Sequence, residues 1–599
     1  MKNRMGLICL ALIGFGNAHA QTGMVVTSTE VSNILKGSYT ASTYQASTVI
    51  TNPDIISAGL LGAISPDSLK ADLFAMRRFQ NRNTFSDTVS NTRGIGAARR
   101  WVYNKFLQYS SANENRLRVA YLQFTYAPAS AGCSGTSSIN RHYNVLGVLP
   151  GSQTADKSLI IVEGHLDSRN SNNCDVTGDA FGIGDNATGS ALVMELARVM
   201  SKYTFKNTIV FMVNTGEEQG TVGGQAFADY LSNLNIPVKA VNNNDVSGGI
   251  FCGHTSSAPS CPFYGAIDST DLRIFSLGSF NSPHKQWARY VKLEYKEQLS
   301  GISTVQTNIQ IMTNEDRTGR GGDHQPFRAD GYTAVRFTQA NEDGNASNGP
   351  GYTDRQHNIR DSLGLDKNGD GVEDSLYVDL DYLARNAVIN GNSMAMVALG
   401  PDTTTLTAAV ISANRISVKF SPAGQPAYRV AIRSTTNDWD SVYTITGRSA
   451  DTVIIPYGLN TTFYISAAAV DNSNTESQFS TEYALTTQMT VLALTDTTTS
   501  LPPTAAAGYG IELLQNKPNP FDEATTITVL SGTDYFQDRA MITICSLDGR
   551  VVERIKLPLK KGINEVVYDH GYGVTGTYIC SLLIDGLPVQ SRKMIFTRK

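Results

Sequence analysis

Hydrophobic positions between residues 84 and 400 fall into short apolar runs that alternate with helical stretches. Four of the runs are rich in β-branched residues, as buried strands are. They are Leu159–Val162, Thr208–Val213, Val238–Val241 and Ala334–Phe337. Apolar residues recur at helical spacing in Ala97–Tyr109 and Ser190–Met200. This alternation predicts an α/β domain with a mostly parallel central sheet and helices on both faces.

The helical pattern ends near residue 400, and two stretches of short alternating strands follow. The first stretch, residues 401–490, includes Ile416–Phe420, Ala427–Ile432 and Thr462–Ala467. Residues 491–507 form a Thr/Pro/Ala-rich linker with little to bury, and a second alternating stretch covers residues 508–599. We therefore predict two all-β sandwich domains after the α/β domain.

The first 83 residues contain two further segments. Lys2 and Arg4 precede an apolar run, Met5–Phe15, and Ala18-His19-Ala20 follows, which is the layout of a secretory signal peptide. The apolar run is shorter than the ~20 residues that a membrane-spanning helix needs, so we expect cleavage after Ala20 and no transmembrane segment. Residues 21–83 are rich in Ser and Thr and are predicted to be a separate segment without an assigned role.

The charge balance excludes some classes of partner. Charged residues make up 17% of the chain and the net charge is −4, so no strongly basic surface is expected for nucleic acid or acidic lipid. A neutral solute or a peptide is the expected ligand.

Six cysteines remain once Cys9 is removed with the signal, and an even number in an exported chain suggests disulfides. Cys252 and Cys261 close a short loop, and Cys545 and Cys580 lie together in the last domain. These two pairings are therefore predicted, and Cys133 with Cys174 follows by elimination. Zinc binding by the cysteines is not favoured, because none of them forms a Cys-x-x-Cys pair.

The candidate chemistry begins directly after the first apolar strand. His165 and Asp167 follow Leu159–Val162, and a zinc-bound imidazole usually has its other nitrogen oriented by a carboxylate. Asp185 lies in a glycine-bracketed turn before the helix that starts at Ser190, where it could bridge two cations.

Two more predicted strands also end in carboxylates. Glu217 and Glu218 follow the strand Thr208–Val213, and Asp245 follows Val238–Val241. Adjacent carboxylates repel each other unless a cation or a shared proton compensates. Ligands of open α/β sheets bind beyond the carboxyl ends of the strands, so these side chains are expected to converge on one rim. A last histidine is needed for a second metal, and His357 and His324 are the candidates.

Taken in order, these motifs resemble the zinc aminopeptidases related to the Streptomyces and Vibrio enzymes and the glutamate carboxypeptidases. The resemblance covers about residues 97–400 and implies a peptidase with two zinc ions that acts on peptide ends. It implies that Asp185 bridges the ions, that Asp245 joins His165 on one ion, and that Glu218 and His357 bind the other. Glu217 would be the general base.

The same resemblance assigns a wall of the substrate pocket to the stretch Asp323 to Phe327, which includes His324, and this favours His357 as the ligand. Two departures stand out. The interval from His165 to Asp185 is longer than in the family and contains Cys174. Gln356 occupies the position where a tyrosine often assists the oxyanion.

A separate acidic loop follows His357. Oxygen-bearing side chains alternate with other residues, and a glycine stands at the sixth position, a spacing that resembles a calcium-binding loop. The candidate ligands are Asp366, Asn368, Asp370 and Asp374. A solvated turn is the alternative.

The two β domains resemble known modules of exported proteins. Residues 401–490 resemble a fibronectin type III module. Residues 508–599 resemble the C-terminal sorting domain of the type IX secretion system, on the strength of Pro518-Asn-Pro-Phe521, Asp548-Gly-Arg550 and Gly576-Thr-Tyr578. This second resemblance implies contact with a secretion machinery, passage across an outer membrane, and an extracellular or surface-attached protein.

Alternative functions remain open on the sequence alone. A carboxypeptidase on the same scaffold would need cations to hold a terminal carboxylate, and Arg317, Arg320 and Arg328 are available. A glutaminyl cyclase would use one zinc ion, which the full ligand set argues against. A surface adhesin with an inactive peptidase domain would not require every ligand position to be filled.

Overall fold

The structure is a computed structural model that describes residues 22–597 with several gaps. The gaps are residues 254–260, 262, 279–281, 317–319, 343–354, 370–372, 413, 435, 437, 458–460, 488–510, 522–523, 535–538, 547–549 and 571–574. The predicted signal peptide and linker lie outside the described residues. The chain forms two compact units, one with residues up to 406, 420–449 and 466–483, the other with residues 407–419, 450–465 and 484 onward.

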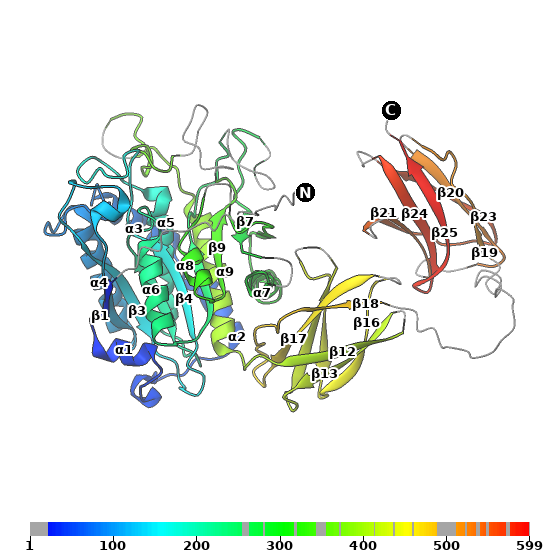
Figure 1. Ribbon diagram of the computed structural model, residues 1–599, viewed down its shortest axis with the longest axis horizontal. Coiled ribbons are helices and arrows are strands. Elements are labelled where there is room, and N and C mark those ends of the chain that lie inside the picture. Colours follow the sequence, from blue (N-terminus) through cyan, green and yellow to red (C-terminus); the bar gives the residue numbers. More distant parts are fainter. Residues whose placement is uncertain are drawn as a thin grey trace, which may run out of the picture. The chain divides into compact units, whose positions relative to one another are not determined.

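A nine-stranded sheet is the centre of the first unit (Figure 1). Its strands lie in the order β1-β2-β3-β5-β4-β6-β9-β7-β8. Their bounds are β1 Thr22–Val26, β2 Arg118–Thr125, β3 Arg141–Leu149, β4 Leu159–His165, β5 Ile209–Asn214, β6 Val238–Asn244, β7 Asp271–Phe275, β8 Asn308–Ile311 and β9 Ala334–Gln339. The four apolar runs of the sequence correspond to β4, β5, β6 and β9.

The sheet is mixed, which corrects the prediction of a mostly parallel sheet. The central strands β5, β4, β6 and β9 pair in parallel. On one side β1, β2 and β3 add antiparallel strands, and on the other β7 pairs antiparallel with β9. The β2 positions alternate between buried and half-buried, as expected where one face of an antiparallel strand is less covered, whereas β3 is buried on both faces over its last six residues.

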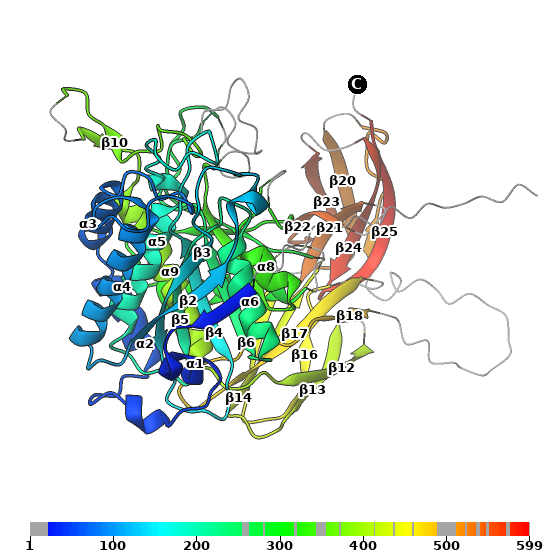
Figure 2. The same cartoon turned by 60° about the vertical axis from the view of Figure 1, so that its left-hand side comes forward.

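Helices cover both faces of this sheet, and each face has its own hydrophobic core. Ile160 and Val162 of β4 pack in the core shared with α2, α3, α4, α5, α7 and α9, whereas Leu159 and Ile161 face α1, α6 and α8. Figure 2 views the sheet with α3 and α4 on its left and α6 and α8 on its right. The bounds are α1 Thr29–Leu35, α2 Pro53–Ala63, α3 Pro66–Arg77, α4 Gly94–Ala112, α5 Thr188–Met200, α6 Val222–Asn233, α7 Pro283–Glu294, α8 His324–Ala329 and α9 Leu380–Leu399. None of the helices in the described ranges has the length and apolarity to cross a bilayer.

The N-terminal residues belong to this fold, which corrects the prediction of a separate segment at residues 21–83. Strand β1 pairs with β2, and α2 and α3 contribute buried residues such as Leu60 and Leu73 to the core. Both helices begin with a side-chain cap, Asn52 and Ser65, followed by proline. These Asn-Pro and Ser-Pro pairs are helix-start signals that the sequence contained.

A four-stranded sheet, β15-β14-β17-β18, follows the nine-stranded sheet and its helices in the chain. The part of this sheet that belongs to the first unit contacts helix α7. The buried carboxylate of Glu482 pairs with Arg433 of β14, and its Oε1 atom lies 3.4 Å from Nη1 of Arg289 in α7. A three-stranded sheet, β12-β13-β16, accompanies it in the chain. The bounds are β12 Thr405–Ser412, β13 Arg415–Ser421, β14 Ala427–Arg433, β15 Ser441–Thr446, β16 Ala450–Ile454, β17 Thr462–Val470 and β18 Tyr483–Thr486.

The last domain is a β-sandwich around one core. Its sheets are β19-β20-β23 and β22-β21-β24-β25, and apolar residues of both, such as Ile527 and Ile542, share that core. The bounds are β19 Ile511–Leu513, β20 Ala524–Ser531, β21 Ala540–Ser546, β22 Val551–Lys556, β23 Gly562–Asp569, β24 Gly576–Ile584 and β25 Leu587–Phe596.

The cysteines of this sandwich are free, so the predicted Cys545–Cys580 disulfide is wrong. In the β21–β24 register Cys545 lies opposite Ile579 and Cys580 lies opposite Ile544. Because neighbouring residues of a strand point to opposite faces, the two thiols lie on different sides of the sheet. Disulfides do join Cys252 to Cys261 and Cys133 to Cys174.

Candidate metal centre

Three neighbouring parallel strands deliver the candidate ligands to one edge of the sheet. Strand β4 ends at His165, β5 ends three residues before Glu217, and β6 ends one residue before Asp245. Since β5, β4 and β6 are adjacent and parallel, their carboxyl ends meet at the same edge. The predicted convergence of these side chains is therefore a direct result of the strand order.

The first ligand group consists of His165, Asp185 and Asp245. The Nε2 atom of His165 lies 3.1 Å from Oδ1 of Asp185 and 3.6 Å from Oδ1 of Asp245. All three side chains are buried. One imidazole and two carboxylates at this spacing are a ligand set that zinc accepts.

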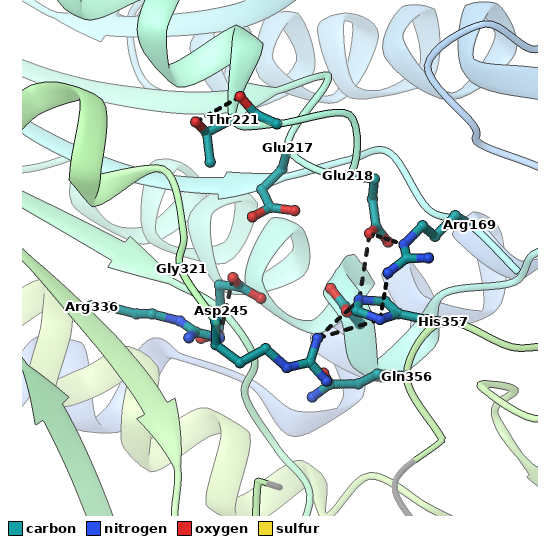
Figure 3. A pocket seen from close by; sticks show the side chains of 12 residues that line it. Arg169, Glu217, Glu218, Thr221, Asp245, Gly321, Arg336, Gln356 and His357 are labelled. Carbon is teal, nitrogen blue, oxygen red and sulfur yellow. Dashed lines mark hydrogen bonds and ion pairs between the residues drawn. The ribbon is translucent and has the colours of Figure 1, made fainter. Parts of the chain in front are cut away.

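The second ligand group consists of Asp185, Glu218 and His357. The Nε2 atom of His357 lies 3.0 Å from Oδ2 of Asp185 and 3.5 Å from Oε2 of Glu218 (Figure 3). Asp185 thus offers one oxygen to each group. The arrangement is that of two cation sites joined by a shared carboxylate, with His324 absent from both groups.

The electrostatics of the buried groups show a deficit of positive charge. Burial raises the pKa of Glu218 to about 8, and the Asp185 charge adds to this shift. Burial likewise raises the pKa of Glu217 well above its ordinary value. For His165 burial acts to lower the pKa, but the neighbouring carboxylates of Asp167, Asp185 and Asp245 outweigh it and raise the pKa. Each of these raised pKa values means that the site holds a proton where its negative charge needs compensation. Divalent metal ions would supply the same positive charge, so the residues present fit them.

Asp167 contacts residues of both ligand groups without belonging to either. Its Oδ1 atom lies 3.6 Å from Nδ1 of His165, the nitrogen that faces away from the ligand group. Its carboxylate also accepts hydrogen bonds from the backbone nitrogens of Glu217, at 3.3 Å, and Glu218, at 3.1 Å. Asp167 therefore positions the histidine of one group and the glutamate of the other.

Asp245 is oriented by a buried arginine on β9. The Nη2 atom of Arg336 lies 3.3 Å from Oδ2 of Asp245, which leaves Oδ1 facing His165. Arg336 is itself held by Asp316, at 2.8 Å, and by Glu342, at 3.0 Å. The sequence did not single out this arginine, although it lies within a predicted strand.

The Asp185 loop is held by a residue that sequence reasoning missed. The carboxylate of Asp361 accepts hydrogen bonds from the backbone nitrogens of Gly184, at 2.7 Å, and Asp185, at 2.9 Å. Asp361 lies four residues after His357, whose backbone φ of 59° is uncommon for a residue with a side chain. The only feature of the sequence that pointed to Asp361 was an acidic residue a few positions after the last ligand, His357.

A cavity of about 240 Å³ opens beside the two groups. Its wall contains Glu217, Glu218, Asp245, Arg320 and His357, with Arg169, Asp185, Gly220, Thr221, Gly321, Arg336 and Gln356 completing it. Figure 3 shows the Glu217 carboxylate between Asp245 and Glu218, directed into the open space. Glu217 belongs to neither ligand group and is free to act on a bound molecule.

Asp323, His324 and Phe327, which the family resemblance places at the wall of the substrate pocket, do not line this cavity. All three are buried. Asp323 accepts a hydrogen bond from Asn214, and Phe327 packs edge-on against Phe227 in the core under α6 and α8. The preceding residues Arg320 and Gly321 line the cavity instead.

The acidic loop after His357 is described only in part, and Asp370 lies outside the described residues. Strands β10, Gly364–Leu365, and β11, Ser375–Leu376, pair at its base. Asp366 accepts a hydrogen bond from the Gly369 nitrogen and Asp374 from the Lys367 nitrogen, at 2.7 and 2.6 Å. The described residues of this loop form no metal-binding group.

Comparisons with known proteins agree with this geometry. The family model "Peptidase family M28" matches residues 144–369, which contain both ligand groups. A probable zinc metalloprotease of Phaeosphaeria nodorum is 31% identical over 370 residues, 58% of this chain and 70% of the relative. Another, of Pyrenophora tritici-repentis, is 31% identical over 361 residues, 58% of this chain and 78% of the relative.

Solved structures of aminopeptidases are similar at a coarser level. The LapA aminopeptidase of Legionella pneumophila is 17% identical, with a TM-score of 0.40 over 58% of this chain and 74% of that one. The sequence relationships identify the family: the chain belongs to peptidase family M28 and is a zinc metallopeptidase.

Proposed function

We propose that this zinc peptidase is an aminopeptidase that works with two zinc ions. His165 and Asp245 would hold one ion, Glu218 and His357 the other, and Asp185 both. The observation that carries the proposal is the sharing of Asp185 between two ligand groups at the wall of one cavity. A single-zinc glutaminyl cyclase would leave the second group without a role.

The cavity favours action at the end of a peptide. Its volume of about 240 Å³ is below the ~300–1,000 Å³ of pockets that enclose drug-sized ligands. A single terminal residue fits such a space. The wall carries Glu217 beside the metal groups, and its carboxylate can attract the ammonium group of a free N-terminus.

Zinc at these positions would polarise the scissile carbonyl and lower the pKa of water. Glu217 then takes the proton of the attacking water, because its carboxylate faces the cavity and is not a ligand. The same carboxyl returns the proton to the departing amine. Asp167 holds the backbone of Glu217 in place during both transfers.

A substrate panel tests the direction of cleavage. We expect the purified chain to hydrolyse aminoacyl substrates with a free N-terminus and a blocked C-terminus, and to leave N-acetylated peptides intact. A chelator should abolish the activity and zinc should restore it. Cleavage of N-acetylated peptides with a free carboxylate would refute the aminopeptidase assignment.

The position of Arg320 at the cavity wall supports a carboxypeptidase as the second candidate. It lines the cavity, with its Nη1 atom 3.2 Å from Nε2 of His357, and could hold a terminal carboxylate. Of the other two arginines considered, Arg328 pairs with Glu315, and Arg317 lies outside the described residues. In the panel, an Arg320→Gln variant that loses activity only on free carboxylates would favour this candidate.

We further propose that the protein is exported and sorted through residues 508–599. The two disulfides support an oxidising compartment, and the last domain folds around its own core. The fibronectin type III-like and type IX sorting assignments are part of this proposal. Deleting residues 508–599 should retain the enzyme inside the cell. Unchanged activity in the medium would reject the sorting role.

The loop of Asp366, Asn368, Asp370 and Asp374 is proposed as a calcium site that braces the His357 segment. We expect calcium to raise the thermal midpoint of the protein with both zinc sites filled. An Asp366→Asn variant with an undiminished response would reject the site.

A further inference from the structure

A short buried segment between α3 and α4 contacts both loops that carry metal ligands. Residues 81–86 are all buried, although most of them are polar. Buried loops require partners for their polar groups. The partners of this segment lie around His165 and Asp185, more than 80 positions later in the chain.

Arg82 makes the central contacts of this segment. Its Nε donates to the carbonyl of Leu166 at 2.7 Å, next to the ligand His165. Its Nη2 donates to the carbonyl of Gly182 at 2.8 Å, and its Nη1 to that of Phe181 at 2.5 Å, just before Asp185. One planar guanidinium therefore bridges the two loops that carry His165 and Asp185 of the first ligand group.

The neighbours of Arg82 reinforce the same two loops. The Thr84 hydroxyl donates to Oδ2 of Asp167 at 3.1 Å, the carboxylate that positions His165. The Arg82 backbone nitrogen donates to Oγ of Ser168 at 3.2 Å, and that hydroxyl donates to the Ala180 carbonyl at 2.6 Å.

The loop that Arg82 holds is also tightly packed. Gly182 has a φ of 49°, and a Cβ there would lie 2.3 Å from the Cβ of Ser168. Asn81 and Asn83 donate to carbonyls of the insert before Asp185, at Gly178 and Asn173, at 2.6 and 2.9 Å. The stretch between His165 and Asp185 is therefore held at several points by residues 81–86.

We propose that Arg82 is a positioning residue of the metal centre, which holds the His165 loop and the Asp185 loop at the separation that zinc binding requires. The inference rests on the proposed two-zinc site. It assigns a function to the N-terminal residues, because Arg82 lies outside the stretch 144–369 that matches the peptidase family. Removal of groups that orient metal ligands typically costs about 10–100-fold in metal affinity.

Arg116 provides a matched control. It is also buried, and it donates to three backbone carbonyls, those of Tyr44, Ser201 and Tyr203, at 2.8 to 3.0 Å. Ser201 caps the far end of α5, about 20 Å along the helix from the Asp185 loop. Arg116 therefore has the same chemistry as Arg82 without access to the ligand loops.

The experiment compares zinc affinity, thermal stability and kinetics in full-length Arg82→Gln, Arg82→Lys and Arg116→Gln proteins. Zinc affinity is measured by competition with a chromophoric chelator. We expect Arg82→Gln to bind zinc at least tenfold more weakly than the wild type. Its kcat should fall by a larger factor than its KM changes. Arg116→Gln should lower the thermal midpoint with wild-type zinc affinity. Arg82→Lys should also bind zinc more weakly, because one ammonium group cannot span both loops.

Arg82→Lys decides the question if Arg82→Gln does not fold. Zinc binding by the wild-type chain tests the two-zinc site itself. Wild-type affinity in every soluble Arg82 variant, while the wild type binds zinc, would overturn the role of Arg82 alone.

Discussion

The carboxylate of Asp361 accepts a hydrogen bond from the backbone nitrogen of Asp185 at 2.9 Å. Asp361 belongs to the segment that supplies His357, and Asp185 is common to both ligand groups. This contact links the last ligand of the chain to the residue on which both metal sites depend.

Replacing Asp361 with alanine should therefore weaken both the fold and the zinc site. It leaves two backbone N–H groups, of Gly184 and Asp185, without their acceptor, at a cost of about 2 kcal/mol in unfolding free energy. Chelator competition should show weaker zinc binding. The control is Asp379→Ala, which removes the cap of α9 at Tyr382 and should lower stability while zinc affinity stays unchanged. Equal zinc affinities in the two variants would argue against the link.

Glu217 and Glu218 are adjacent but have different roles, which a pair of substitutions separates. Glu217→Gln should lower kcat by roughly 10²–10⁴-fold and retain the zinc content, because Glu217 is in neither ligand group. Glu218→Gln should lose zinc from the group that contains His357. Metal analysis of each purified variant alongside its kinetics checks this. Zinc loss in Glu217→Gln would contradict the proposed roles.

Metal removal should make stability depend on pH. Burial raises the pKa of Glu218 from 4.5 to about 8, so the folded metal-free protein binds a proton that the unfolded chain releases above pH 4.5. The stability due to this group is complete below about pH 4.5 and is lost as the pH rises to about 8. Asp185, whose pKa is lowered, acts only at more acidic pH.

Thermal midpoints of chelated and zinc-loaded protein between about pH 5 and 8 provide the measurement. The difference between the two forms should widen with pH, because zinc binds the deprotonated ligands. A difference that stays constant over this range would count against the site.

Thiol labelling distinguishes the cysteines. In denaturant without reductant, Cys545 and Cys580 should react with iodoacetamide, whereas the four cysteines in the Cys133–Cys174 and Cys252–Cys261 disulfides should not. Replacing Cys133 and Cys174 together should cost roughly 2–5 kcal/mol. A Cys545→Ser control should change stability by less than about 1 kcal/mol. Protection of Cys580 from the reagent would be the opposite result.

The metal site was predictable because its ligands follow strand ends. Parallel strands place their carboxyl ends together, so the convergence of His165, Glu218 and Asp245 could be expected before their distances were known. The choice of Glu218 over Glu217 as a ligand came from the family resemblance. Asp361 and Arg82 were not predictable in the same way. They act through backbone groups far away in the sequence, and such contacts leave no periodic pattern.

The fold was predictable where local patterns govern it. The central strands carry their own apolar signature, but the antiparallel additions on either side depend on long-range pairing. Cys545 and Cys580 show the same limit, because a shift of one residue in register decides whether two thiols meet. The starts of α2 and α3 were available in their Asn-Pro and Ser-Pro caps.

The most direct test of the two-zinc site is anomalous scattering at the zinc edge from crystals of active protein, with elemental analysis of the same sample. We predict two zinc peaks per chain, one between His165 and Asp245 and one between Glu218 and His357, with Asp185 bound to both. A single peak, or none at these residues in active protein, would contradict the account.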